Sequence, residues 1–130
     1  MVKNIFEDEK LTYNDAVRKL ILRENVDKNE RNIIASHQFY LPAGKNAEEV
    51  ERADEEIVTV GNIDEVKADV LYDFDYAALG HLHRAGTVGK DYVRYAGTPM
   101  QCSVSEVGQE KGILCVEIKE KGNINIEKLV

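Results

Sequence analysis

The strongest structural signal in this 130-residue chain is the stretch FDYAALGHLHR at residues 74–84. Residues 74–80 form a short apolar run that predicts a buried strand, and the run leads directly into His81-Leu82-His83. A second apolar run at residues 32–36 predicts another buried strand, and it ends at His37. Ligand sites of open α/β sheets form at the carboxyl ends of strands. The sequence therefore predicts that all three histidines of the chain lie at one such edge.

The flanking segments predict an α/β fold with a mixed sheet. Apolar residues with helical spacing from about Asn14 to Ile21 predict a helix, capped by Thr12 or Asn14, ahead of the first strand. Residues 56–60 predict a strand and residues 63–71 a helix. The β-type runs are at residues 87–88, 92–95, 112–119 and 123–129, with turns at 89–91 and 120–123. We expect parallel strands first and antiparallel hairpins at the C-terminus, in a single domain over residues 1–130.

Composition excludes several classes of protein. Hydrophobic residues make up 43% and charged residues 32%, which is typical of a folded domain. No apolar run has the length of a membrane span or of a signal peptide, so we expect a cytoplasmic protein without membrane association. Cys102 and Cys115 stand apart with no C-x-x-C pattern, which argues against a thiolate zinc site. We expect both cysteines to be buried or inert.

The charge balance bears on partners. The net charge of −7 argues against binding nucleic acid through a general basic surface. It allows a site at which bound metal ions supply the positive charge and meet phosphate directly.

The three histidines support two interpretations. Imidazole is the commonest protein ligand for transition metals, which favours a metal site formed by His37, His81 and His83. A single histidine at a strand end is more often a hydrogen-bonded structural residue. In an extended segment His81 and His83 would point to the same side, whereas a turn at Gly80 could direct them to two adjacent ions.

Several motifs resemble those of the SbcD-type nucleases, a family of calcineurin-like metallophosphoesterases. FDYAALGHLHR at 74–84 resembles the late metal-binding motif of that family, and RYAGTPM at 94–100 resembles its Y-x-G-[ST]-P segment. VSE at 104–106 and KG at 111–112 fit the continuation, and IASHQ at 34–38 resembles the lone-histidine motif. The resemblance covers about residues 31–118 and implies the C-terminal half of the phosphoesterase domain, a partial metallophosphoesterase sandwich.

The resemblance also implies a chemistry. His37 and His81 would ligate one metal and His83 the other, in a two-metal site that favours Mn²⁺. Such a pair would activate a water and stabilise charge on the phosphoryl oxygens of a DNA phosphodiester. The Gly97 backbone and the Thr98 hydroxyl would lie near the substrate, although the same residues fit a plain turn. The implied partners are an SbcC-like ATPase and DNA, in repair and recombination.

The chain also departs from the family. The early D-x-H, G-D-x-x-D and G-N-H-[DE] motifs are absent, so no catalytic residue is assigned; GNID at 61–64 imitates the last motif with Ile63 in place of histidine. We expect a fragment of a metal-dependent DNA exonuclease and endonuclease that is inactive alone and that self-associates over an open sheet edge. Whether it is a truncated product, a split gene or a degenerate paralogue stays open.

Two other functions remain as alternatives. One is a non-catalytic metal- or partner-binding domain derived from a phosphoesterase scaffold, which fits the acidic charge and the missing aspartates. The other is a phosphoesterase acting on a nucleotide or a phosphoprotein. D-x-H and G-N-H-D motifs encoded upstream of Met1 would decide in favour of the nuclease.

Overall fold

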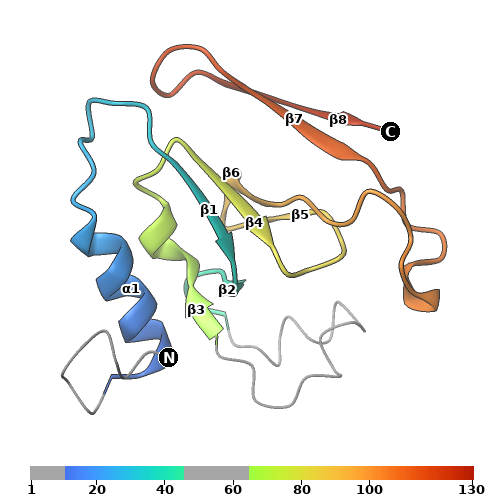
Figure 1. Ribbon diagram of the computed structural model, residues 1–130, viewed down its shortest axis with the longest axis horizontal. Helices are drawn as coiled ribbons and strands as arrows, with labels where there is room; N and C mark the ends of the chain where they lie inside the picture. Colours follow the sequence, from blue (N-terminus) through green and yellow to red (C-terminus); the bar gives the residue numbers. More distant parts are fainter. Residues whose placement is uncertain (1–10, 46–64) are drawn as a thin grey trace.

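The computed structural model describes residues 11–45 and 65–130. Figure 1 shows the order of the elements along the chain. They are helix α1 (Tyr13–Arg23), strands β1 (Ile33–His37), β2 (Phe39–Leu41) and β3 (Glu65–Lys67), the 3₁₀ helix η3 (Ala68–Leu71), strands β4 (Tyr76–Gly80), β5 (Gly86–Val88) and β6 (Lys90–Tyr95), the 3₁₀ helix η4 (Val104–Glu106), and strands β7 (Ile113–Ile118) and β8 (Ile124–Leu129).

The main sheet has four strands in the order β1-β4-β6-β5. Strand β4 pairs in parallel with both β1 and β6, and β5 is antiparallel to β6. The predicted α/β class with a mixed sheet, parallel strands first, is therefore confirmed for the described residues. Strand β4 lies between two neighbours, and Tyr76, Ala77 and Leu79 are buried, which is why its sequence is a continuous apolar run.

Helix α1 begins where the sequence predicts. Thr12 caps it: its hydroxyl accepts a hydrogen bond from the Asp15 amide, and the Asp15 carboxylate accepts one from the Thr12 amide. Ala16 is fully buried and Val17 packs against the core. The helix packs against β3 and η3, as Figure 1 shows.

The prediction of a helix over residues 63–71 is wrong for the described part of that range. Glu65–Lys67 forms β3, which pairs in parallel with β2, and only Ala68–Leu71 is helical, as one 3₁₀ turn. Val66 is fully buried opposite Tyr40. Pairing with β2 outweighs the weak helical spacing, and the four remaining residues are too few for an α-helix. The predicted strand at residues 56–60 lies outside the described residues.

The core lies between the main sheet, the β2–β3 pair and η3. Its largest fully buried aliphatic and aromatic side chains are Tyr40, Leu41, Val66, Leu71, Leu79 and Val93. These residues come from five different elements, so the core depends on the parallel arrangement of the strands rather than on local contacts.

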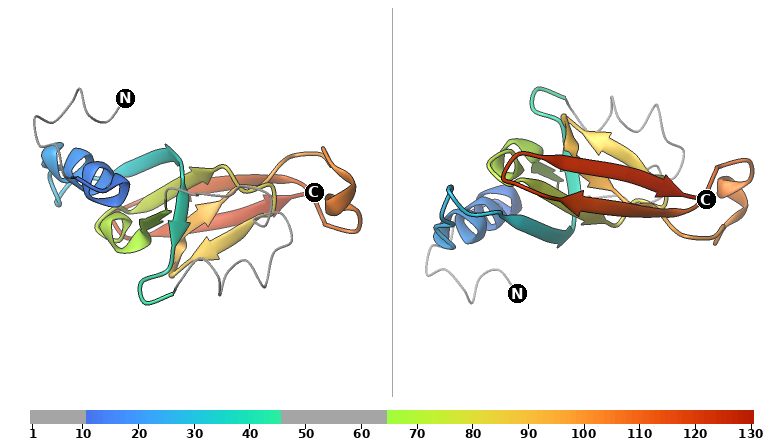
Figure 2. Two further views of the ribbon diagram at one scale, coloured as in Figure 1. Left: turned by 90° about the horizontal axis from the view of Figure 1, so that it is seen from below. Right: turned by 90° about the horizontal axis from the view of Figure 1, so that it is seen from above.

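Strands β7 and β8 form the predicted C-terminal hairpin. Exposed and half-buried residues alternate along both strands, so only one face is sheltered. The hairpin runs over one side of the molecule, as Figures 1 and 2 show. Between it and the sheet lies an open groove of about 450 Å³, lined by Arg31, Ile33, Tyr76, Val116 and Ile118.

Asp75 joins the hairpin to the sheet. Its carboxylate accepts hydrogen bonds from the Asn32 amide at 2.8 Å, just before β1, and from the Gly122 amide at 3.1 Å, in the hairpin turn. The Lys121 ammonium group lies 3.0 Å from the same carboxylate. Burial raises the pKa of the Asp75 carboxyl, but these three partners outweigh burial and hold the pKa below its usual value.

The sequence predicts that the cysteines are buried or inert, and the predicted burial is wrong. Cys102 and Cys115 are both exposed, and both are free thiols. Cys115 lies on β7 at a position where the alternation places side chains on the open face, and Cys102 lies in the loop before η4. Among the helices of the described residues, none is long and apolar enough to cross a membrane.

The Asp75 contacts predict an acid-sensitive stability. The folded carboxyl binds protons less readily than the unfolded one, so the free energy of unfolding should fall as the pH drops below about 4. Asp75→Asn should lower it by about 1–3 kcal/mol at pH 7, because the Asn32 and Gly122 amides and the Lys121 ammonium group lose a charged acceptor. The difference from the parent chain should shrink as the pH falls. Urea unfolding between pH 3 and 7 measures both effects. Asp73→Asn, at an exposed ion pair with Lys28, is the control and should change little.

The open edge of the main sheet predicts self-association. Within the described residues β1 pairs only with β4, and Ile33 on β1 is 59% exposed. Sedimentation velocity should detect concentration-dependent dimers. Ile33→Lys should shift them toward monomers, whereas the same change at Ile113, equally exposed on the hairpin, should not. A monomer at all concentrations would contradict this prediction.

Candidate metal and phosphate site

The parallel pairing brings three strand ends to one edge of the sheet. His37, the last residue of β1, lies opposite Gly80, the last residue of β4. Leu79 pairs in turn with Tyr95, the last residue of β6, and the Leu79 carbonyl accepts a hydrogen bond from the Ala96 amide. The segments that follow these strands therefore begin side by side, as predicted for the carboxyl ends of a parallel sheet.

His37 and His81 are neighbours. Their ring centroids lie 5.5 Å apart with the planes at 85°, an edge-to-face contact. The ring centroid of Phe39 lies 6.3 Å from the ring centroid of His81. Two histidines that are 44 positions apart in the sequence thus meet because their strands are paired.

Gly80 makes this contact possible. A Cβ atom at Gly80 would lie 2.8 Å from Nδ1 of His37, closer than side chains allow. The expected tight turn at Gly80 is not what is found. The backbone turns one residue later, at His81, which has a φ of +109°. A non-glycine residue in this region carries backbone strain, which is concentrated at functional sites in proteins.

Tyr95 holds the turn that follows His37. Its hydroxyl donates a hydrogen bond to the Gln38 carbonyl at 2.9 Å and accepts one from the Tyr40 amide at 2.8 Å. Burial raises the pKa of the Tyr95 hydroxyl well above its usual value, so the group stays protonated and keeps both bonds. The end of β1 is thereby tied to the end of β6.

The surroundings of His81 favour the neutral imidazole. Partial burial lowers the pKa of His81, and the neighbouring His37 and His83 lower it further. A neutral ring keeps a nitrogen lone pair for a hydrogen bond or for a metal ion.

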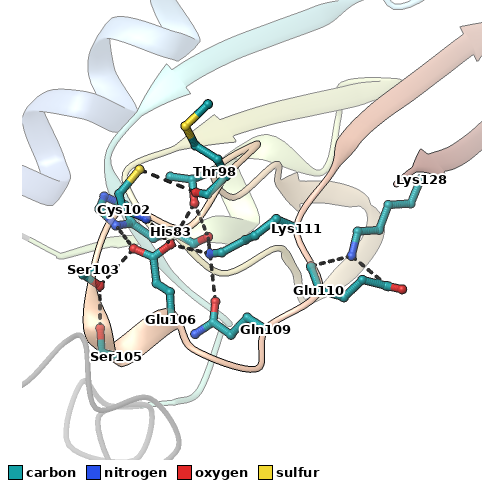
Figure 3. Close-up of polar contacts among 11 residues, drawn as sticks. His83, Thr98, Cys102, Ser103, Ser105, Glu106, Gln109, Glu110, Lys111 and Lys128 are labelled. Atoms are coloured by element: carbon teal, nitrogen blue, oxygen red, sulfur yellow. Dashed lines mark hydrogen bonds and ion pairs between the residues drawn. The ribbon is translucent and has the colours of Figure 1, made fainter.

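His83 has a different environment. Its Nδ1 lies 2.9 Å from Oε1 of Glu106, which belongs to η4 (Figure 3). The backbone carbonyl of His83 accepts hydrogen bonds from the Thr98 amide at 3.0 Å and from the Lys111 ammonium group at 2.9 Å. The loop after β6 therefore holds both the ring and the backbone of His83.

Among the described residues, Glu106 is the charged residue that is buried, and its side chain has no exposed surface. Its Oε2 lies 2.7 Å from the Lys111 ammonium group and accepts from the Thr98 hydroxyl at 3.1 Å. The Ser103 hydroxyl donates to Oε1 at 3.0 Å, and the Cys102 amide to Oε2 at 3.2 Å. Lys111 lowers the pKa of the Glu106 carboxyl far below its usual value, although burial acts in the opposite direction. The hydrogen bonds with His83, Cys102 and Ser103 lower this pKa further.

Gly97 and Thr98 lie beside His83. Gly97 has a φ of +73°, and a Cβ there would lie 2.8 Å from the Ala85 amide nitrogen. Glycine is therefore needed at this position, because the turn has a positive φ and leaves no room for a Cβ atom. The Thr98 hydroxyl is engaged with Glu106. Both residues also line a polar cleft of about 270 Å³ with Arg84, Lys111 and Lys128.

The described residues contain no group of three or more histidine, cysteine, aspartate or glutamate side chains arranged to hold a metal ion. What they contain is the adjacent pair His37 and His81, with His83 close enough to affect the pKa of His81. Among residues 11–45 and 65–130 the strand ends therefore bring imidazole rings close together without completing a group of side chains that could hold a metal ion.

No protein-family model matches this chain. The chain is 30% identical over 127 residues to the SbcD component of the nuclease SbcCD from Staphylococcus epidermidis, and the match covers 95% of the chain. The resemblance to SbcD is confirmed. The chain spans only about a third of that relative, 32% of its length.

Sequence reasoning assigned no role to three residues that hold this site in place. Glu106 and Lys111 were noted only as part of a motif continuation, and no role was assigned to them. Charged side chains are mostly exposed, so the full burial of Glu106 is the signal that distinguishes it, and burial requires the fold. Tyr95 is likewise predicted only as part of a strand and of the RYAGTPM motif, with no role for its hydroxyl.

The gap at Gly80 gives a direct test of the histidine pair. Gly80→Ala should displace the His37 ring, because a new Cβ would overlap Nδ1, and it should leave the fold intact because a side chain can rotate away. Nuclear Overhauser effects between the rings of His37 and His81 should be present in the parent chain and lost in the variant. Gly86→Ala is the control, since a Cβ at Gly86 meets nothing within 4 Å. Retention of the ring contacts in Gly80→Ala would contradict the arrangement.

Proposed function

We propose that this chain is the histidine-bearing part of an SbcD-like metal-dependent DNA nuclease, which hydrolyses phosphodiester bonds, and that it is inactive by itself. The observation that carries the proposal is the contact between His37 and His81 at paired strand ends. The similarity to the SbcD nuclease over nearly the whole chain supports the same conclusion.

The residues at the sheet edge are suited to part of a metal centre. Gly80 leaves space that a Cβ would fill, and the His37 ring occupies that space beside His81. We propose His37 and His81 as ligands of one ion and His83 as a ligand of a second. Bound Mn²⁺ ions would polarise a phosphodiester and activate a water. Manganese prefers oxygen ligands, so histidines alone should bind it weakly.

The substrate and partners follow from the same proposal. The cleft beside His83 is lined by Gly97 and Thr98 together with Arg84, Lys111 and Lys128, and we propose that it receives the DNA backbone. The net charge of −7 means that bound cations, rather than the protein surface as a whole, would attract phosphate. We propose an SbcC-like ATPase as the partner protein and the cytoplasm as the location, in DNA repair and recombination.

Calorimetric titration with Mn²⁺ tests the metal site. The parent chain should bind Mn²⁺ weakly, and His81→Ala should lower the affinity at least about tenfold, because it removes a ligand that cannot be replaced locally. Asn125→Ala, at an exposed position of β8, is the control and should leave the affinity unchanged. Absence of any Mn²⁺ binding to the parent chain would contradict the proposed site.

Activity is measured separately on linear double-stranded DNA with Mn²⁺. The chain alone should release no nucleotides above the level of the His81→Ala variant. Cleavage by the parent chain that the variant loses would show a complete centre and would overturn the proposed inactivity.

A further inference from the structure

The loop between β6 and β7 carries one feature that the proposed metal chemistry does not use. Glu106 is fully buried, although a carboxylate is costly to remove from water unless several groups compensate it. Five groups do so, and two of them, the Lys111 ammonium and the His83 ring, are titratable or charged. A buried carboxylate with this many partners is held in one orientation.

The two carboxylate oxygens have different partners. Oε1 lies 2.9 Å from Nδ1 of the His83 ring and accepts from the Ser103 hydroxyl, whereas Oε2 accepts from Lys111, Thr98 and the Cys102 amide. Rotation of the carboxylate would break bonds at both oxygens. Oε1 is therefore fixed against Nδ1 of His83, as Figure 3 shows.

The Lys111 ammonium group lies 2.7 Å from Oε2 and forms an ion pair with the Glu106 carboxylate, and this ion pair determines the proton position on the His83 ring. An ionised carboxylate can only accept hydrogen bonds, so Nδ1 must be the donor. In a neutral imidazole with its proton on Nδ1, the lone pair is on Nε2. Metal-binding histidines in proteins commonly donate their second nitrogen to a carboxylate in this way, which orients the ring and increases its basicity.

We propose that Glu106 is the positioning residue of His83: by accepting the proton-bearing Nδ1 it fixes the ring and reserves Nε2 for a divalent cation. The proposal rests on the assignment of His83 as a metal ligand. Lys111 acts through Glu106, since its charge offsets that of the buried carboxylate and its ammonium group also binds the His83 carbonyl. Residues of the loop from Thr98 to Lys111 thus hold the ring and the backbone of His83 in place.

Two measurements on the full chain test this proposal. The first is a long-range ¹H–¹⁵N correlation spectrum of the histidine rings without metal at neutral pH, with His83 assigned through a His83→Gln variant. The neutral His83 ring should carry its proton on Nδ1. A ring with its proton on Nε2 would overturn the proposal, and this result needs no variant of Glu106 to fold.

The second measurement is Mn²⁺ affinity by calorimetry in Glu106→Gln. The variant retains the shape of the side chain but loses its charge, and the affinity should fall about 10–100-fold while the proportion of the Nδ1-protonated ring decreases. Glu110→Gln is the matched control, because Glu110 lies in the same loop and pairs at the surface with Lys128. The control should change neither quantity.

The outcomes separate the two proposals. If the parent chain binds no Mn²⁺, the proposed metal site fails, and the spectrum still decides whether Glu106 sets the His83 ring. If Glu106→Gln is folded by circular dichroism and keeps both the affinity and the ring state of the parent chain, the positioning role is overturned. If the variant does not fold, the parent spectrum alone decides.

Discussion

Parallel pairing of β1 with β4 is the constraint on which the site depends. It places His37 opposite Gly80, and the next residue along the chain is His81. A shift of this register by one residue would turn His37 to the other face of the sheet, because side chains alternate along a strand. The pairing is stabilised from outside the site by Asp75, which binds the residue before β1, and by Tyr95, which binds the turn after it.

The site combines two kinds of histidine environment. His37 and His81 contact one another directly, and the space for them comes from a missing Cβ and a strained backbone. His83 is held by a buried carboxylate within a polar network. The first arrangement is an edge-to-face contact between two rings, whereas the second fixes one ring by charge-assisted hydrogen bonds.

Much of this could be predicted from local sequence. The strand predicted at residues 74–80 is found at Tyr76–Gly80, and the strand ending at His37 and the alternating C-terminal hairpin are confirmed. Each of these predictions depends on the apolar pattern of nearby residues. The β2–β3 pair, the burial of Glu106 and the exposure of both cysteines were not predicted. Each of these depends on what a segment meets from a distant part of the chain, and periodicity does not contain that information.

The sequence by itself determined the chemistry available: three histidines at strand ends, a glycine before one pair of them, and motifs that resemble those of the SbcD nucleases. Only the tertiary structure decided how these groups are used. In the fold the backbone does not turn at Gly80; the missing Cβ there leaves room for the His37 ring. The fold also places the Glu106 carboxylate within hydrogen-bond distance of the His83 ring, 23 residues earlier in the sequence. The reason is physical: hydrogen bonds and packing act over a few ångströms in space, and the fold alone sets which residues come within that distance.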